Sequence, residues 1–371
     1  MNKKFWATTF TLTGTIVGAG ILGLPYVFSK SGFLVGLFWL IVLGAVMIYV
    51  NLALGEVTLR TRGKHQLAGY AEKYLGPWGK RLMFFAMVFG VYSALLAYLI
   101  GEGQSLSQII PGNTHPIVFG VIFWLIMTLL LREGLKGLKR IETWGVIAII
   151  AIVSGIFIRF VQFVEPANLM AWNQSNFALP IGVVLFALLG FTSIPELRKE
   201  IKGQEKLMKR AIILGTIIPI ILYIAFSAVF IGVLGTSITE IATLSFGPLM
   251  TILGIFTMMT SYFVLSFSLK DTFKYDLNTR KKTSFLLTSL IPLFLYILTT
   301  QFDFIGFILI LSIGGVISGG LTGIIILIMA KKAKANKRNN KEPEINIPIN
   351  WILIIILSTI FIASIILEFT R

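Results

Sequence analysis

The feature that most constrains this chain is the recurrence of apolar runs about as long as a membrane is thick. A helix needs roughly 20 apolar residues to cross a bilayer, and the 371-residue chain contains eleven such runs. Charged residues make up only 13% of the chain, against about 25% in soluble domains. We therefore predict an all-α integral membrane protein with about eleven transmembrane helices. The runs lie at about 5–28, 33–59, 82–110, 116–131, 141–163, 177–196, 207–234, 246–275, 284–300, 304–330 and 350–368.

The basic residues lie between these runs and indicate a topology. Of the 32 Lys and Arg residues, all but Lys30, Arg159 and Arg371 fall on the side of the amino terminus. Lys and Arg accumulate in cytoplasmic loops, so we predict a multi-pass cell-membrane protein with a cytoplasmic amino terminus and an outside carboxy terminus. The net charge of +16 follows this topology and does not indicate a nucleic-acid partner. Nothing in the sequence indicates an oligomeric state.

Glycine and proline interrupt the first apolar run, where a spanning helix is expected to be continuous. The segment from Gly14 to Tyr26 reads GTIVGAGILGLPY. Glycine lets the backbone approach a ligand closely, proline removes a hydrogen-bond donor, and both weaken a helix. Non-helical backbone at membrane depth persists only where it is buried in protein or lines a cavity. We therefore predict a broken helix and a binding site here.

The interruption recurs in the sixth run. Gly20 and Pro25 share their spacing with Gly190 and Pro195, which stand 170 residues further along. Helices 2 to 5, shifted by about the same distance, fall on helices 7 to 10. Because five spans separate the copies, the second must run in the opposite direction, which makes an inverted repeat. The predicted units are a first five-helix repeat at 1–165, an inverted second repeat at 177–330, a cytoplasmic linker at 331–349, and an eleventh helix at 350–371. Within the linker, the stretch from Lys331 to Glu344 is expected to be solvated and flexible.

Two antiparallel helices broken near the bilayer middle predict recognition of a zwitterion. The amino end of a half-helix presents free N–H groups and a positive dipole to a carboxylate, and freed carbonyl groups suit an ammonium group or a cation. In the first run we expect donors from Ala19 to Ile21 and acceptors from Thr15 to Val17, and in the sixth run acceptors from Phe186 to Leu189. The alternative is that these glycines only permit close helix packing.

Three segments carry a resemblance to a known family. They read IVGAGILGLPYVFSKSGF in helix 1, FALLGFTSIPELRKEIKG in helix 6 and TSYFVLSFSLKDTFKYDL in helix 8. Together they resemble the amino acid/auxin permease family, within the amino acid, polyamine and organocation transporter superfamily. The resemblance covers helices 1 to 10. It implies the five-plus-five inverted-repeat fold of the bacterial leucine transporter, a central amino acid site, and secondary transport driven by sodium or protons.

The breaks and the resemblance together predict the substrate-binding residues. Phe186 matches the aromatic position that covers the substrate in relatives, with ordinary core packing as the alternative. Because neither break carries a charged side chain, we expect a neutral, apolar or aromatic amino acid as substrate. The predicted set is Thr15, Ile16, Gly18, Ala19, Gly20, Ile21, Tyr92, Phe186, Ala187, Leu189 and Gly190.

The resemblance also implies a coupling ion. In sodium-coupled members of this fold, one sodium ion lies between helix 1 carbonyl groups and two helix 8 hydroxyl groups. The alternative for such hydroxyls is a bond to a preceding carbonyl of their own helix. A proton is the second option, with Glu102 as proton carrier, vestibule carboxylate or wetted interfacial residue. Sodium is favoured because no ionisable residue lies near the middle of the broken helices. The matching positions are Gly14, Val17, Thr257, Thr260 and Ser261.

Two other classes of function fit a membrane protein less well. An intramembrane enzyme needs paired catalytic side chains, but no span holds two partnered carboxylates or a His beside a Ser, and the chain has no Cys. A non-transporting amino acid sensor on the same fold stays an alternative. We therefore predict a secondary active amino acid transporter, not an enzyme, without a cofactor other than the coupling ion.

Overall fold

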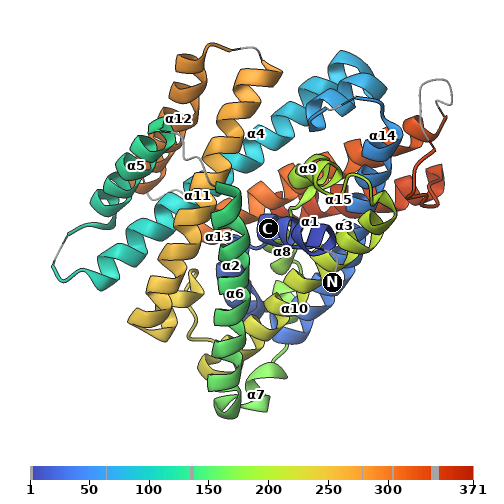
Figure 1. Ribbon diagram of the computed structural model, residues 1–371. Helices are drawn as coiled ribbons and strands as arrows, with labels where there is room; N and C mark the ends of the chain where they lie inside the picture. The colour runs from blue at the N-terminus through green and yellow to red at the C-terminus, as the bar shows by residue number, and fades with distance from the viewer. Residues whose placement is uncertain are drawn as a thin grey trace.

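The computed structural model describes residues 3–63, 65–112, 114–133, 138–277, 279–302, 305–335 and 342–370, and the regular elements in these ranges are helices (Figure 1). The α-helices are α1 (Lys3–Ile16), α2 (Gly20–Ser31), α3 (Phe33–Arg60), α4 (Leu67–Ile109), α5 (Pro116–Glu133), α6 (Leu138–Phe160), α7 (Pro166–Leu169), α8 (Pro180–Ala187), α9 (Ile194–Glu200), α10 (Met208–Leu234), α11 (Pro248–Asp276), α12 (Lys281–Phe302), α13 (Phe307–Gly314), α14 (Leu321–Ala335) and α15 (Trp351–Phe369). Short 3₁₀ turns are η1 (Val161–Phe163), η2 (Gln174–Asn176), η3 (Phe191–Ser193), η4 (Glu205–Leu207) and η5 (Ala242–Phe246), and η6 (Gly315–Gly320) is a π-helix that joins α13 to α14.

The predicted all-α membrane architecture is confirmed over the described residues. Eight stretches there are long and apolar enough to cross a membrane, and α1 with α2, bent by 56°, makes a ninth. Two shorter apolar helices, Pro116–Arg132 and Ile149–Phe163, fall on the two remaining predicted runs. The third run was expected to begin near 82, whereas α4 already begins at Leu67 and kinks at Gly76, whose φ of 76° favours glycine.

Helix α4 organises the packing of the molecule. It has 43 residues and crosses the whole view in Figure 1. It packs against α5, α11, α13 and α14, while α10 packs against α1 and α3. Elements from the two halves of the chain therefore interleave, as the predicted inverted repeat requires.

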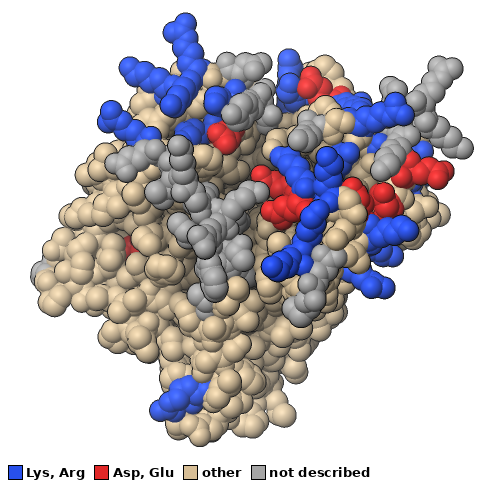
Figure 2. Space-filling view, viewed as in Figure 1, with Lys and Arg blue, Asp and Glu red and all other residues tan. Residues whose placement is uncertain are grey.

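On the face shown in Figure 2, the charged residues gather toward one end. Figure 2 shows Lys and Arg, with Asp and Glu among them, over the upper part of this face, whereas the lower part is almost uncharged. A bilayer needs such an uncharged band around the protein. The distribution agrees with basic loops on one side, and the cytoplasmic assignment of that side stays a prediction.

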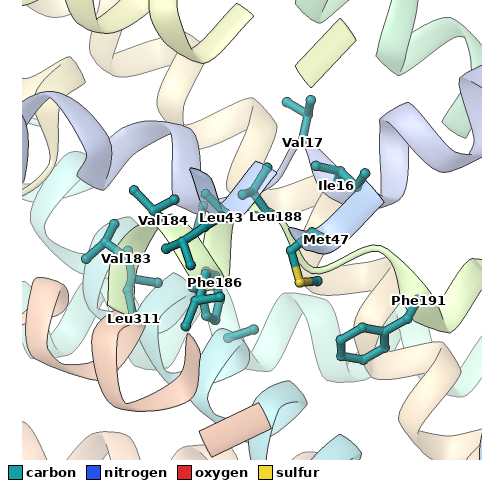
Figure 3. Packing of buried hydrophobic residues seen from close by; sticks show 14 of the residues in the cluster. Ile16, Val17, Leu43, Met47, Val183, Val184, Phe186, Leu188, Phe191 and Leu311 are labelled. Carbon is teal, nitrogen blue, oxygen red and sulfur yellow. The ribbon is translucent and has the colours of Figure 1, made fainter. Parts of the chain in front are cut away.

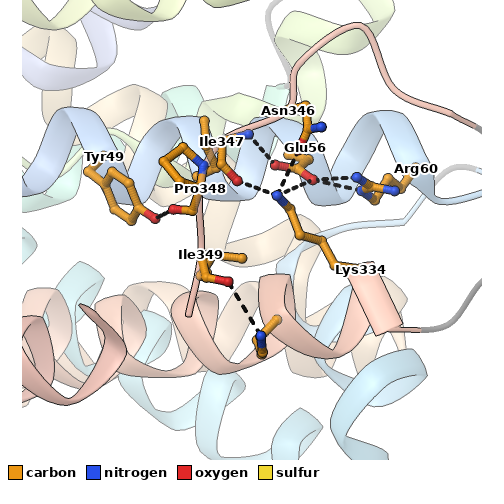
Figure 4. Close-up of polar contacts among 9 residues, drawn as sticks. Tyr49, Glu56, Arg60, Lys334, Asn346, Ile347, Pro348 and Ile349 are labelled. Atoms are coloured by element: carbon orange, nitrogen blue, oxygen red, sulfur yellow. Dashed lines mark hydrogen bonds and ion pairs between the residues drawn. The ribbon is translucent and has the colours of Figure 1, made fainter. Parts of the chain in front are cut away.

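The linker predicted before the last helix is helical in its first residues and packed on the protein in its last ones. Helix α14 continues to Ala335, and residues 343–350 run extended beside α3 (Figure 4). Ile345, Ile347 and Ile349 are buried, and the residues between them are exposed. Successive side chains of extended backbone point to opposite sides, so one side of this segment packs on the protein. We call residues 343–350 the strap; residues 336–341 lie outside the described ranges.

A buried carboxylate on α3 holds the strap. The Glu56 side chain is 1% exposed and accepts a hydrogen bond from the N–H of Ile347 at 2.9 Å. Arg60 donates to the same carboxylate from Nε and Nη2, both at 2.7 Å. The ammonium group of Lys334 on α14 lies 3.4 Å from Glu56 and donates to the carbonyl group of Ile347 (Figure 4). Glu56 thus links α3, α14 and the strap, which a flexible linker would not do.

The strap leads to a stability prediction. Glu56→Gln keeps the shape of the side chain but leaves Arg60 and Lys334 without their buried carboxylate. We expect a loss of about 1–3 kcal/mol, seen as a lower thermal unfolding temperature of the purified protein in detergent. Glu72→Gln is the matched control, because Glu72 pairs with Lys80 at 2.9 Å but is 48% exposed, and exposed pairs contribute little. Equal unfolding temperatures for the two variants would contradict this role of Glu56.

Candidate functional site

The first spanning segment is broken at Val17–Ala19, as predicted. The N–H of Val17 still donates to the carbonyl group of Thr13 at 2.9 Å, and the helix begins again at Gly20. The bend of 56° between α1 and α2 falls on these three residues. Backbone groups of the turn are thereby free to meet groups from other elements.

The sixth spanning segment is broken between α8 and α9, also as predicted. Helix α8 ends at Ala187, and the 3₁₀ turn Phe191–Ser193 leads into Ile194. The hydroxyl group and the N–H of Ser193 donate to the carbonyl group of Gly190 at 2.9 and 3.2 Å. The break therefore satisfies part of its own backbone.

The two breaks touch each other at their glycines. A Cβ on Gly20 would lie 2.4 Å from the Cα of Ala187, and a Cβ on Gly190 would lie 2.5 Å from Cγ1 of Ile16. No side chain fits at such distances. Figure 3 shows Ile16 and Val17 of one break close to Leu188 of the other, among buried side chains. At Gly20 the close approach of the Ala187 backbone is the physical reason for glycine, whereas at Gly190 it is the close packing of the Ile16 and Leu12 side chains.

Two buried tyrosines hold the broken backbone. The hydroxyl oxygen of Tyr223 on α10 lies 2.8 Å from the carbonyl oxygens of both Ile16 and Ala187. The hydroxyl oxygen of Tyr98 on α4 accepts a hydrogen bond from the N–H of Ala19 at 3.3 Å. The two tyrosines thus contact two of the predicted acceptors and one predicted donor, and a second predicted donor, the N–H of Ile21, donates to the carbonyl group of Gly18 at 3.3 Å. Sequence reasoning missed Tyr223, because an unbroken apolar run gives no signal for one tyrosine within it.

A cavity of about 80 Å³ lies beside the breaks. Its walls come from α1, α2, α4, α8, α11, η3 and η6. Six predicted residues line it, namely Thr15, Ile16, Gly18, Gly20, Phe186 and Leu189. Nine further residues complete the lining, namely Met87, Gly90, Val91, Ala94, Tyr98, Phe191, Thr192, Leu265 and Ser318.

The other predicted substrate residues lie at or beyond the edge of this cavity. Ala19, Ile21, Ala187 and Gly190 belong to the breaks or their flanks without lining the cavity. They contribute backbone and packing.

Tyr92, another residue of the predicted set, does not line this cavity. Its hydroxyl group donates to the carbonyl group of Leu287 on α12 at 3.1 Å, and its ring lies 6.4 Å from that of Phe273. Tyr98, six residues further along α4, lines the cavity instead. Six residues are not a whole number of helical turns, so the two tyrosines point to different sides.

The hydroxyl groups predicted to bind sodium are in different surroundings. Those of Thr257 and Thr260 donate to carbonyl groups of their own helix, α11. Ser261 approaches the break, since its Oγ lies 3.9 Å from the position of a Cβ on Gly18. Gly14 lies in the last turn of α1 and Val17 begins the break.

Glu102 on α4 is fully buried, so a wetted interfacial role is wrong. Neither carboxyl oxygen has a hydrogen-bond partner among the described residues. Its neighbours are tightly packed, since a Cβ on Gly101 would lie 2.5 Å from the sulfur of Met258 and one on Gly103 would lie 2.7 Å from the hydroxyl oxygen of Tyr296. A buried charge without a partner is very costly, so these surroundings favour the neutral acid.

Comparison with known proteins points to amino acid transporters. Residues 1–367 match the tryptophan/tyrosine permease family. The chain is 26% identical to tyrosine-specific transport system 1 of Haemophilus influenzae over 60% of this chain and 56% of that protein. Tyrosine-specific transport system 2 of the same organism is 25% identical over 64% of this chain and 60% of that protein. Glutamine transporter 2 of Aliivibrio fischeri is 24% identical over 79% of this chain and 81% of that protein. The matches thus span less than two thirds of the two tyrosine-specific relatives.

A solved structure confirms the predicted fold. The structure of MhsT in complex with L-phenylalanine matches with a TM-score of 0.69 and 16% sequence identity, over 98% of this chain and 97% of that chain. The predicted leucine-transporter-type fold is therefore shown. A family of amino acid transporters, and not of enzymes, is also shown, while the finer assignment to the amino acid/auxin permease family stays a prediction.

The contact between the breaks leads to a second prediction. Gly20→Ala places a methyl group against the backbone of Ala187, and we expect it to cost about 1–3 kcal/mol and to lower the thermal unfolding temperature of the purified protein. Gly155→Ala in α6 is the control, because nothing lies within 4 Å of a Cβ added there and alanine favours a helix. If both variants unfolded at the same temperature, the two breaks would not touch as described.

Proposed function

The chain belongs to the tryptophan/tyrosine permease family, and on this premise we propose that it is a secondary active transporter of a neutral, in particular an aromatic, amino acid. One observation carries the proposal: two helices are broken at the same place, in contact through Gly20 and Ala187, beside a cavity. Broken helices give a transporter both donors and acceptors at membrane depth. Alternating access then moves the parts around this site.

The lining of the cavity supports an aromatic substrate. Phe186, Phe191, Met87 and Leu265 present apolar side chains, and none of the lining residues is charged. Apolar walls with few polar groups are typical of sites for apolar ligands. The names of two relatives as tyrosine-specific systems, and L-phenylalanine in the MhsT structure, agree with this choice. The carboxylate would meet the amino end of α2 at Gly20, which lines the cavity, because the N–H groups of Ala19 and Ile21 already donate to Tyr98 and to the carbonyl group of Gly18.

Uptake by the purified protein in liposomes tests the function. We expect accumulation of labelled tyrosine, phenylalanine or tryptophan, and competition by the other neutral amino acids but not by Arg or Glu, because an uncharged cavity does not compensate a side-chain charge. Counterflow of labelled substrate separates a carrier from a sensor. Absence of uptake and counterflow for all twenty amino acids would contradict transport and favour the sensor.

For the coupling ion we propose sodium at the break between α1 and α2. The proposed ligands are the carbonyl groups of Gly14 and Val17 and the hydroxyl groups of Thr257, Thr260 and Ser261. The proximity of Ser261 to Gly18 supports this position. A hydroxyl group that donates its hydrogen to a carbonyl keeps lone pairs for a cation, so the bonds of the two threonines within α11 are compatible with binding.

A proton bound by Glu102 is the second candidate, and its burial without a hydrogen-bond partner favours it. An ionisable group inside a membrane is a functional candidate by default. The described charged residues of the surrounding helices α5, α11 and α12 lie at the helix ends that are far along the chain from Pro116, Met258 and Tyr296. Near the start of α13, Glu240 accepts a hydrogen bond from the N–H of Ile308.

The two ions make opposite predictions for Glu102→Gln. Gln resembles the neutral acid but cannot release a proton. If the proton drives transport, this variant should lose accumulation under a pH gradient while exchange of labelled for unlabelled substrate continues. If sodium drives transport, Glu102→Gln should still accumulate substrate under a sodium gradient. Replacing sodium by choline at fixed pH should then abolish accumulation by the wild type and by both variants. Glu72→Gln is the control for replacing a carboxylate. Accumulation by Glu102→Gln under a pH gradient without sodium would exclude Glu102 as the carrier.

A further inference from the structure

The hydroxyl oxygen of Tyr223 fills the gap between the two helix breaks. It is 2.8 Å from the carbonyl oxygen of Ile16 and 2.8 Å from that of Ala187, and Tyr223 is fully buried. Ile16 is the last residue of α1 and Ala187 the last residue of α8. One side chain from a third helix, α10, therefore reaches the freed carboxyl ends of both half-helices.

Two carbonyl groups that point at one spot need a positive partner. The carboxyl end of a helix carries partial negative charge, so the two oxygens repel each other. In transporters with broken helices, such carbonyl groups coordinate the driving cation. Here the neutral hydroxyl group of Tyr223 contacts both carbonyl oxygens. It has one hydrogen to donate, and the two oxygens lie at equal distance from it. Tyr223 does not line the cavity, so it acts on a substrate only through the two breaks.

We propose that Tyr223 is a positioning residue that joins the two breaks and takes the place of a cation between them. The inference rests on the proposed transport function. It confines any sodium ion to the other side of the break, toward Gly14 and Ser261, and it makes the relative position of the breaks independent of salt. Removing the hydroxyl group should loosen the breaks and leave an oxygen pair that a small cation can occupy.

Tyr223→Phe tests this, with Tyr296→Phe as the matched control. Tyr296 is also buried, and its hydroxyl group donates to one carbonyl, that of Pro116, at 3.2 Å. We expect Tyr223→Phe to raise the KM for tyrosine uptake about tenfold, which corresponds to about 1.4 kcal/mol, and Tyr296→Phe to leave it near the wild-type value. Sodium, titrated against choline at constant ionic strength, should lower the KM of Tyr223→Phe more than that of Tyr296→Phe.

Several results would overturn the inference. An unchanged KM in Tyr223→Phe would exclude positioning, and an equal rise in both variants would show a general effect of losing a buried hydroxyl group. A raised KM with the same sodium response in both variants would exclude the replacement of a cation. If Tyr223→Phe does not fold, 3-fluorotyrosine at position 223 or 296 takes its place, because it alters the acidity of the hydroxyl group while keeping the ring. An equal KM for both fluorinated proteins would then contradict the inference.

A second readout separates this inference from the proposed function. Absence of any uptake by the wild-type protein would count against the transport function. The role of Tyr223 would then be tested by the thermal unfolding temperature. In that measurement, sodium in place of choline should raise the unfolding temperature of purified Tyr223→Phe more than that of Tyr296→Phe. Equal shifts would overturn the inference even if the wild type transports tyrosine.

Discussion

A helix inside a membrane can be broken only where other groups replace its lost hydrogen bonds, and the centre of this structure depends on that constraint. The breaks at Val17–Ala19 and Leu188–Ser193 are placed against each other, so each provides partners or packing for the other. The hydroxyl group of Tyr223 is the donor for the freed carbonyl groups of Ile16 and Ala187, and the hydroxyl oxygen of Tyr98 accepts a hydrogen bond from the N–H of Ala19. Gly18 and Leu189 of the two breaks line the cavity.

The surroundings of the breaks divide into a packed part and an adaptable part. At Gly20 the two backbones touch without space for a methyl group, which fixes their distance. The cavity walls also include residues of α4, α11 and η6, and a π-helix is a local irregularity often found at functional sites. At the charged end, Glu56 joins α3, α14 and the strap in one buried network. The structure is thus fixed by close backbone packing at the breaks and by a buried polar network at its charged end.

Much of the fold could be predicted, because the bilayer imposes a simple rule on length and polarity. The apolar runs matched helices, and the Gly and Pro residues of the first and sixth runs marked both breaks. Phe186 and Leu189, which lie near those breaks, line the cavity. Tyr92 does not line it, because a helix presents different sides within six residues and only packing decides which side faces the break. The strap was missed because its alternating isoleucines stand in a polar segment.

By itself the sequence determined the membrane class, the number of spans and the position of both interruptions, because these depend on local composition and on glycine and proline chemistry. Tertiary structure alone decided which side chains serve the interruptions. Tyr223 stands in an ordinary apolar run, Glu102 at the end of another, and Glu56 among basic residues. Their roles arise from partners far away in the chain, or from the lack of one, and such contacts are set by helix packing rather than by local pattern.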